Sequence, residues 1–218
     1  MRRRVTLATV LVGGLAVPAA APAAVTVSFW HMDETSGSTM VDSVDGANGR
    51  LRDVGIGATA HYGRGYRFNG SSSVVTVPHT RAHDVPSRTT FTVDALVRFP
   101  DPPRTVGDFD LVRKGLSGTQ GGHWKMEIFG NGKGYCRFRG SSGTVTVNAG
   151  PRLDDDHWHR ISCVKRTASV TLVVDGRSYT RRKRVGAIRN HASLAVGAKA
   201  SGGDWYRGLM DEVSIKLG

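Results

Sequence analysis

The segment HRISCVKRTASVTLVVDGRSY, residues 159–179, alternates apolar and polar side chains with a period of two residues. In its first half His159, Ile161 and Cys163 share one face, and the residues between them share the other. Successive side chains of a β-strand point to opposite faces, so this alternation predicts strands with one side against a core. An Asp-Gly pair at 175–176 then lies between two strand-like runs, and this pair favours the type I′ turn of a tight β-hairpin. The segment therefore predicts neighbouring antiparallel strands.

The residues that lead into this segment, DDDHWHRISC at 154–163, suggest a competing interpretation. They concentrate aspartates, histidines and a cysteine, which are side chains that bind metals or move protons. His157 and His159 are two residues apart and could share a ligand. The alternation that starts at Trp158 instead favours aspartates in a turn, followed by a strand. We expect the start of a strand here, with a metal site as the alternative.

Runs with the same period recur along the chain and are separated by clusters of glycine, asparagine, aspartate and proline. The clearest are SSVVTVP, FTVDALVRF, HWKMEIFG, YCRFRG, GTVTVNA, SLAVGA and MDEVSIKL. They predict about nine or ten short strands, whereas no helical periodicity extends over three turns. So many evenly spaced strands in one domain are typical of an all-β antiparallel β-sandwich or jelly roll.

The N-terminal residues have the pattern of a secretory signal peptide. Arginines at 2–4 precede an uncharged apolar run at 5–17, and an Ala-x-Ala motif ends at Ala23. We predict that residues 1–23 are removed, that residues 24–218 form one domain, and that the protein is secreted. The apolar run is short for a transmembrane helix and no second run follows it, so no membrane span is predicted.

The chain is strongly basic, with 30 lysines and arginines, 18 aspartates and glutamates, and a formal charge of +12. Removal of the three N-terminal arginines leaves a charge of about +9, which favours acidic partners such as anionic polysaccharide. Nucleic acid is also a polyanion, but the sequence has no nucleic-acid-binding motif and few aromatic residues placed to stack on bases. We therefore expect no nucleic-acid partner.

Two segments contain candidate ligand-binding residues. These residues are Arg181, Arg182, Lys183, Arg184, Trp205 and Tyr206. The first four form the run RRKR, which is either a solvated strand edge that resists pairing with other chains or a patch for an anionic glycan. The last two lie in the glycine-rich segment SGGDWYRG, where their rings either stack on a sugar or pack against the core.

Cys136 and Cys163 are the only cysteines. Because secretion exposes a protein to an oxidising environment, we expect a disulfide between them, on neighbouring strands. The bridge would close a loop of 163 − 136 = 27 residues and stabilise the fold by roughly 3–4 kcal/mol. A reactive thiol or a two-cysteine metal site is the alternative.

Five motifs, taken in order, resemble a known family. They are FWHMDETSGSTMVDSVDGANGRL at 29–51, GYRFNGSSSVVTVP at 65–78, TTFTVDALVRF at 89–99, LDDDHWHRISCVKR…VTLVVDG at 153–176, and SLAVGAK…YRGLMDEVSIKL at 193–217. The pattern resembles the laminin-G-like, concanavalin A-like lectin/glucanase jelly-roll domains of secreted bacterial proteins. The resemblance covers roughly Val25 to Leu217 and implies a jelly-roll sandwich. One scaffold can host many activities, so the resemblance says more about fold than about function.

The resemblance also implies a structural calcium ion. Domains of this family often hold one between the N-terminal region, an aromatic-Asp/Asn-Gly turn and the last strand, which nominates Asp33, Asn69, the carbonyl of Gly70, and Asp211. Asp211 is in phase with the apolar residues of MDEVSIKL, so its carboxylate is expected on the core side, where it needs hydrogen bonds or a cation. Asn69 stands where an aspartate is commoner. The alternative is that backbone N–H groups alone satisfy Asp211.

Related sandwiches include glucanases, so a glycoside hydrolase is the enzyme alternative. That reaction normally needs two carboxyl groups across a cleft. The domain contains only Glu34, Glu127 and Glu212, and Asp108 and Asp110 have no glutamate partner in their own segment. Motifs for a nucleophile elbow or a phosphate loop are also missing. We therefore predict a non-catalytic binding or adhesion module for carbohydrate or an extracellular protein, with a polysaccharide-cleaving enzyme or a structural cell-envelope protein as alternatives.

Overall fold

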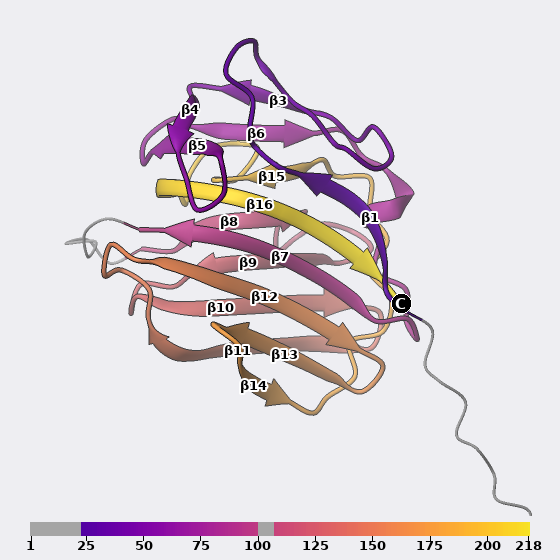
Figure 1. Ribbon diagram of the computed structural model, residues 1–218. Coiled ribbons are helices and arrows are strands. Elements are labelled where there is room, and N and C mark those ends of the chain that lie inside the picture. The colour runs from indigo at the N-terminus through magenta and orange to yellow at the C-terminus, as the bar shows by residue number, and fades with distance from the viewer. Residues whose placement is uncertain (1–22, 100–106) are drawn as a thin grey trace, which may run out of the picture.

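The computed structural model describes residues 23–99 and 107–218 and shows two antiparallel sheets of eight strands each, packed face to face (Figure 1). Sheet A, nearer the viewer in Figure 1, comprises β1 (Val25–Trp30), β4 (Gly55–Thr59), β5 (Arg64–Asn69), β7 (Phe91–Arg98), β12 (Trp158–Arg166), β13 (Ser169–Val174), β14 (Arg177–Arg181) and β16 (Arg207–Leu217). Sheet B comprises β2 (Thr39–Met40), β3 (Gly49–Arg52), β6 (Val74–Val77), β8 (Phe109–Lys114), β9 (His123–Ile128), β10 (Lys133–Gly140), β11 (Gly143–Arg152) and β15 (Leu194–Val196). The predicted all-β antiparallel sandwich is confirmed. The predicted signal peptide lies outside the described residues, except for Ala23.

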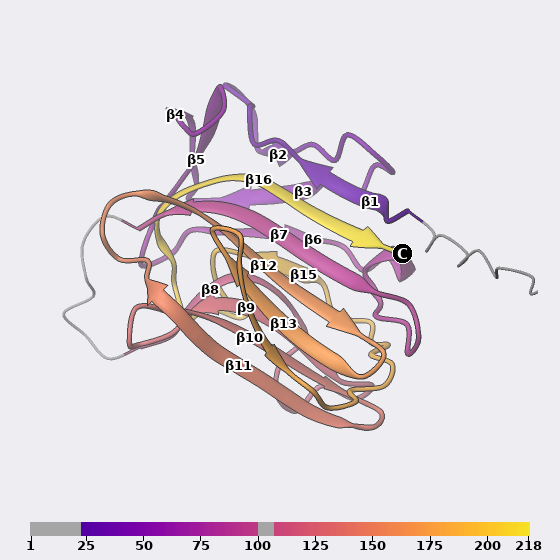
Figure 2. The ribbon, with the colours of Figure 1, turned by 60° about the horizontal axis from the view of Figure 1, so that its bottom comes forward.

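The last strand, β16, lies in the interior of sheet A. The order of sheet A is β14-β13-β12-β7-β16-β5-β4, and β1 also pairs with β16. Sheet B has the order β11-β10-β9-β8-β15-β6-β3-β2. Figures 1 and 2 both show β16 running beside β1 and β7. One strand therefore joins segments from the beginning and the middle of the chain.

The segment 159–179 forms β12, β13 and the start of β14, as its alternation predicts. Ile161 pairs with Val174 across the first hairpin. In the second turn Asp175 and Gly176 have φ values of 47° and 80°, and a type I′ turn requires positive φ at both central residues. The sequence signal for this hairpin is therefore correct down to the turn residues.

His157 lies in the turn before β12, whereas His159 is the second residue of that strand. His159 Nδ1 lies 2.7 Å from Asp175 Oδ2, and its Nε2 lies 2.9 Å from Asp155 Oδ1. Burial lowers the pKa of His159, but the hydrogen bonds to the two aspartates outweigh it and leave that pKa raised. His157 Nδ1 lies 2.8 Å from the carbonyl oxygen of Asp155. Because β12 begins at Trp158, this segment is the start of a strand, as we expected. Carboxylates occupy both ring nitrogens of His159.

The disulfide between Cys136 and Cys163 links the two sheets. Cys136 lies in β10 of sheet B, Cys163 lies in β12 of sheet A, and their Cα atoms are 5.6 Å apart. The predicted pairing is confirmed, but its expected position on neighbouring strands is wrong. Both side chains are fully buried because they point inward from facing sheets. The bond therefore crosses the core.

The core fills the space between the sheets and is rich in aromatic side chains. Its largest buried members include Trp30, Trp124, Tyr66, Tyr206, Phe68, Phe91 and Phe138. Helix is confined in the described residues to a short 3₁₀ turn, η1 (Arg81–His83). No helix in residues 23–99 or 107–218 is long and apolar enough to cross a membrane.

An irregularity in β16 reverses the expected orientation of Asp211. The register of β16 against β7 shifts after Asp211, and Glu212 has a φ of 52°. Met210, Val213 and Ile215 belong to the core between the sheets. Because side chains alternate along a strand, Asp211 then faces away from that core, next to Met210. The expected core-side position of Asp211 is wrong, because a bulge changes the phase of the strand.

Candidate functional site

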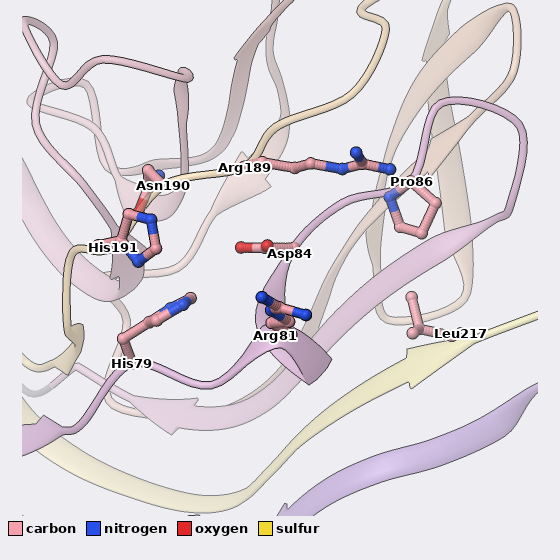
Figure 3. Close-up of a pocket in the computed structure, with 8 residues that line it drawn as sticks. All are labelled: His79, Arg81, Asp84, Pro86, Arg189, Asn190, His191 and Leu217. Atoms are coloured by element: carbon pink, nitrogen blue, oxygen red, sulfur yellow. The ribbon is translucent and has the colours of Figure 1, made fainter.

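A basic cavity of about 590 Å³ lies at the end of the sandwich where β16 ends (Figure 3). We call it the end cavity. Its lining residues are His79, Arg81, Asp84, Pro86, Arg189, Asn190, His191 and Leu217. Figure 3 shows Arg81 and Arg189 on opposite sides of Asp84, with His79 and His191 together at one side. The fold thus gathers two arginines and two histidines from loops that are far apart in the sequence.

A short β-bridge and a buried lysine hold these loops together. Val85 and Ile188 exchange two backbone hydrogen bonds of 2.9 Å. Behind them, Lys114 Nζ lies 3.0 Å from Asp84 Oδ1 and 2.6 Å from the carbonyl oxygen of Asn190. The Lys114 side chain is 1% exposed, and this burial lowers its pKa. A buried cation thus fixes the wall of the cavity.

The electrostatics of the end cavity favour an anion. The one carboxylate that lines the cavity, Asp84, is paired with Lys114. The positive charges of Arg81 and Arg189 therefore have no carboxylate partner within the cavity. The rings of His79 and His191 lie edge to face, with centroids 4.9 Å apart. Burial, followed by the nearby Lys114, lowers the pKa of His79. The ring of His79 is therefore neutral at neutral pH and gains charge in acid.

The end cavity continues along the surface through Arg189. The same arginine lines a neighbouring groove of about 360 Å³. The other residues of this groove are Gly121, Gly122, Arg139, Gly140, Ser141 and Ala187. Arg139 donates a hydrogen bond to the carbonyl oxygen of Ser117, which anchors its guanidinium at the groove. A ligand longer than the end cavity would therefore meet a third arginine.

The predicted basic run at 181–184 forms a separate and more open surface. All four side chains are exposed; Arg181 is the last residue of β14, an edge strand of sheet A, and the other three follow it. Arg181, Arg182 and Lys183 line a groove of about 430 Å³ with residues 144–146 of β11. None of the four forms an ion pair with any residue that the structure describes. The structure does not bring this run to the end cavity, with which it shares no lining residue.

The two aromatic residues predicted to bind ligand have different environments. Tyr206 is 0% exposed, and its hydroxyl lies 3.0 Å from the carbonyl oxygen of Arg98. The prediction that Tyr206 contacts a ligand is wrong, because its ring packs between the sheets. Trp205 is half-buried and packs on a small apolar cluster, with the guanidinium of Arg52 5.7 Å from its ring centroid. A ligand role for Trp205 stays a prediction.

The four residues predicted to bind calcium do not form one site. Asp33 and Asp211 lie at the turn before β5, where they accept backbone hydrogen bonds of 2.8 Å from Arg64 and 2.9 Å from Tyr62. Asn69 ends β5 and pairs with Arg207, whereas Met210, next to Asp211, pairs with Tyr66. Asn69 is thus about four residues along the strands from Asp211, or roughly 13 Å at 3.3 Å per residue. No single ion can reach both.

Local hydrogen bonds explain the position of Asn69. Its Oδ1 accepts from the backbone N–H groups of Ser71, Ser72 and Ser73, at 2.9 to 3.1 Å. Gly70 follows with a φ of 78°, which completes the turn. The predicted calcium site of four residues is therefore wrong, because Asn69 and Gly70 are committed to this turn.

The pair Asp33 and Asp211 still has a feature that suits a cation. Asp211 is 0% exposed, and its Oδ1 has no hydrogen-bond partner among the described residues. Burial, opposed by the Tyr62 hydrogen bond, raises the pKa of Asp211 to about 6. The alternative that backbone N–H groups satisfy Asp211 holds for Oδ2 alone. Calcium binding by this pair stays a prediction.

Asp110 has a glutamate neighbour, Glu127, on the adjacent strand. The two residues are opposite each other in the pairing of β8 with β9, and both side chains are 0% exposed. Burial and the neighbouring Asp110 raise the pKa of Glu127 to about 9. The segment of Asp110 contains no glutamate, as the sequence indicates, but strand register brings Glu127 to it from a separate segment. Neither carboxyl group is open to a substrate.

Sequence reasoning did not find the end cavity, although a signal was present. Each of its two loops carries a histidine and an arginine two residues apart, in the segments His79-Thr-Arg81 and Arg189-Asn-His191. Either segment alone is an ordinary polar loop. Only the pairing of Val85 with Ile188 brings them together, and no local pattern predicts that bridge.

Two curated proteins are similar in sequence to part of this chain. Rabbit (Oryctolagus cuniculus) sex hormone-binding globulin is 34% identical over 80 residues, which cover 37% of this chain and 20% of that protein. The human globulin is 36% identical over 62 residues, covering 28% of this chain and 15% of the globulin. The chain thus spans a fifth or less of the curated relatives it matches.

Solved structures with low sequence identity share the fold. The binding domain of Paraclostridial Mosquitocidal Protein 1 superposes with a TM-score of 0.67 at 15% identity, over 87% of this chain and 48% of that chain. The receptor-binding domain of botulinum neurotoxin D has a TM-score of 0.62 at 10% identity, with the same coverage of both chains. A Trypanosoma rangeli sialidase in complex with sialic acid has a TM-score of 0.60 at 16% identity, over 87% of this chain and 30% of that chain.

The sequence profile of one family matches most of the chain. The match extends over residues 68–216, from the end of β5 to the end of β16. It therefore includes the disulfide, both loops of the end cavity and all the strands between them. Together with the two packed sheets, this match shows that the chain belongs to the laminin G branch of the concanavalin A-like lectin/glucanases superfamily.

Proposed function

We propose that this protein is a secreted, non-catalytic binding module that holds an acidic carbohydrate in the end cavity. The convergence of Arg81, Arg189, His79 and His191 on one hollow is the observation that carries this proposal. A volume of about 590 Å³ falls within the range of small-molecule sites, roughly 300–1,000 Å³. The cavity is thus large enough for sugar units.

The chemistry of the lining matches a sugar that carries a carboxylate or a sulfate. An arginine guanidinium presents paired N–H donors that fit the oxygens of such a group. Arg81 and Arg189 supply this function from two sides of the cavity, and Asp84 is already neutralised by Lys114. The rings of His79 and His191 and the side chain of Asn190 add polar groups that can hydrogen-bond to hydroxyl groups.

The fold is compatible with this assignment. Neighbours of this architecture include toxin binding domains and a sialidase solved with sialic acid, which is an acidic sugar. One study of a structural neighbour reports that cell entry of botulinum neurotoxin type C depends on interaction with two ganglioside molecules. These neighbours are at most 16% identical to the chain, so they support the fold and not a particular ligand.

A binding role is favoured over hydrolysis by the position of the carboxyl groups. Hydrolysis of a glycosidic bond normally uses two carboxyl groups that reach the substrate. The end cavity is lined by one carboxylate, Asp84, which is held by Lys114. Asp110 and Glu127 form a carboxyl pair, but both are fully buried. The cavity can therefore hold an anionic sugar without the groups needed to cleave it.

The test is calorimetric titration with matched acidic and neutral oligosaccharides. We expect the acidic ligand to bind and the Arg81→Gln/Arg189→Gln double variant to lose at least about tenfold in affinity, or 1.4 kcal/mol. The control is Arg160→Gln/Arg166→Gln, which removes the same charge from exposed positions outside the cavity. Equal losses of affinity in the two double variants would mean that the interaction depends only on net charge. Equal affinity for acidic and neutral ligands would also contradict the proposal.

A further inference from the structure

Carboxylates from three separate segments meet on the outer side of sheet B. Asp108 immediately precedes β8, Glu127 lies opposite Asp110 in β9, and Asp204 lies in the loop before β16. The backbone N–H of Asp110 donates to the carbonyl oxygen of Asp204 at 2.8 Å, which fastens that loop to β8. One carboxylate oxygen from each of Asp108, Glu127 and Asp204 lies within 4.8 Å of the others. We call these three residues the carboxylate cluster.

The cluster contains buried oxygens without partners. Glu127 is 0% exposed, and its Oε2 has no hydrogen-bond donor in the described part of the chain. The same holds for Oδ1 of the neighbouring Asp110, which is also 0% exposed. A buried acceptor with no donor is costly, and a buried carboxylate is more so. Glu127 therefore brings to the cluster a buried carboxyl group, one oxygen of which no donor in the described residues satisfies.

Side-chain cations hold the opposite oxygens. Lys125 pairs with Glu127 Oε1, and Lys199 Nζ lies 2.8 Å from Asp204 Oδ1. Arg113 lies 2.5 Å from Asp110 Oδ2. With Asp110 included, four carboxyl groups face three side-chain cations among the described residues. These cations leave Glu127 Oε2 and Asp110 Oδ1 without a cation partner.

We propose that Asp108, Glu127 and Asp204 bind a divalent cation, with Ca²⁺ as the best match. The donor set is made only of carboxylate oxygens, which hard cations prefer and which zinc and copper sites usually supplement with nitrogen or sulfur. The three residues come from a strand and two irregular segments, and Ca²⁺ accepts irregular coordination more readily than Mg²⁺. The ion would tie the loop before β16 to the start of β8 and to β9.

This site is distinct from the pair Asp33 and Asp211 and from the end cavity. Glu127 alternates with the core residues Met126 and Ile128, so it faces outward from sheet B, whereas Asp211 belongs to sheet A. Asp108 directly precedes the first residue of β8, whereas Lys114, which supports the end cavity, is the last residue of that strand. Cation binding here and sugar binding in the end cavity therefore have separate readouts.

Thermal unfolding with calcium measures the proposal directly. The whole chain is freed of metal with a chelator and then melted with and without CaCl₂, with NaCl used to match ionic strength. Binding to the folded state at about a hundred times Kd should raise the melting temperature by roughly 5–10 °C for a chain of this size. Radioactive calcium in equilibrium dialysis gives the number of bound ions independently of stability.

Variants then locate the ion. Asp108→Asn and Asp204→Asn lie at half-buried positions, so they are less disruptive than a change at Glu127. Each should weaken calcium binding at least about tenfold, and the double variant should bind one ion fewer than the wild type. Asp211→Asn is the control and should keep this ion. The proposal is overturned if calcium leaves the wild-type melting temperature unchanged, if the double variant binds as many ions as the wild type, or if Asp211→Asn alone removes the shift.

Discussion

The two basic regions of this molecule are built in different ways. The run at 181–184 places its charges on consecutive residues of an exposed edge, and they form no ion pair with the described residues. The end cavity takes Arg81 and Arg189 from loops joined by a β-bridge and supported by Lys114. Charge density in the sequence is therefore a poor guide to a specific site. A site for one ligand needs charges held at fixed positions around a hollow, and only the end cavity has them.

The largest expected effect concerns the support of the end cavity. Lys114→Met keeps the volume of the side chain but leaves Asp84 without its buried partner, and such a loss typically costs about 3–5 kcal/mol. We expect this decrease in the free energy of unfolding in guanidinium titrations. Lys183→Met removes the same charge from the exposed run and should change it by no more than about 0.5 kcal/mol. Equal stability of the two variants would mean that the cavity is no better supported than the run.

The next largest effect is that of acid, which should affect the end cavity and the exposed run differently. The reason is a buried histidine in the loop of the end cavity. His83 is 0% exposed, its Nε2 lies 2.8 Å from Ser28 Oγ, and burial followed by Lys114 lowers its pKa to about 4. The unfolded chain binds a proton near pH 6.5, so the unfolded state gains protons first as the pH falls. The stability from neutral His83 is present above about pH 6.5 and is lost towards pH 4, up to about 3 kcal/mol.

The variant His83→Gln removes this titration while keeping a polar atom near Ser28. We expect its free energy of unfolding to fall less between pH 7 and pH 4 than that of the wild type. His123 also has its pKa lowered to about 4, chiefly by burial, so some pH dependence should remain in the variant. Identical slopes for the variant and the wild type would show that His83 does not titrate in this range.

Two kinds of acidic ligand should then distinguish the regions by binding. Replacement of all four residues 181–184 by glutamine should lower the salt concentration at which the protein leaves a heparin column, because exposed charges attract a polyanion over a long range. The same variant should bind a short acidic oligosaccharide within about twofold of the wild type, or 0.4 kcal/mol. A large loss of affinity for the short ligand would show that this ligand binds at the run and not in the end cavity.

The smallest expected effect is the pH dependence of binding itself. His79 gains a proton in acid, and its pKa lies below the ordinary value because of burial and Lys114. Affinity for an acidic oligosaccharide should therefore rise a few-fold as the pH falls from 7 towards 5, if the ligand stays ionised. The variant His79→Gln should lose this rise. Arginine and lysine do not titrate in this range, so binding by the run should stay flat.

Local sequence patterns predict this fold well because strands and turns are local. The period of two located the hairpin at 159–179, and the Asp-Gly pair identified its turn. Patterns of this kind carry no information about which residues of distant strands pair with each other. The bulge at Glu212 therefore reversed the expected face of Asp211, and the pairing of β8 with β9 gave Asp110 an unexpected glutamate neighbour.

The candidate sites were harder to predict for the same reason. Asn69 resembles a metal ligand in sequence, but three backbone N–H groups occupy its oxygen. Tyr206 follows a glycine-rich loop, yet it packs in the core. The end cavity and the carboxylate cluster each join residues from different loops, so only the assembled sandwich brings them together.

The interior position of β16 has a consequence for how the chain folds during synthesis. The strand is synthesised after β1, β5 and β7, and each of these three pairs with it in sheet A. Until residues 207–217 are available, the growing chain presents unpaired strand edges, which are the features that promote aggregation. Contacts between such distant segments are also slow to form. The period before β16 pairs with its neighbours is therefore a stage at which sheet A is open to aggregation, whatever the stability of the finished sandwich.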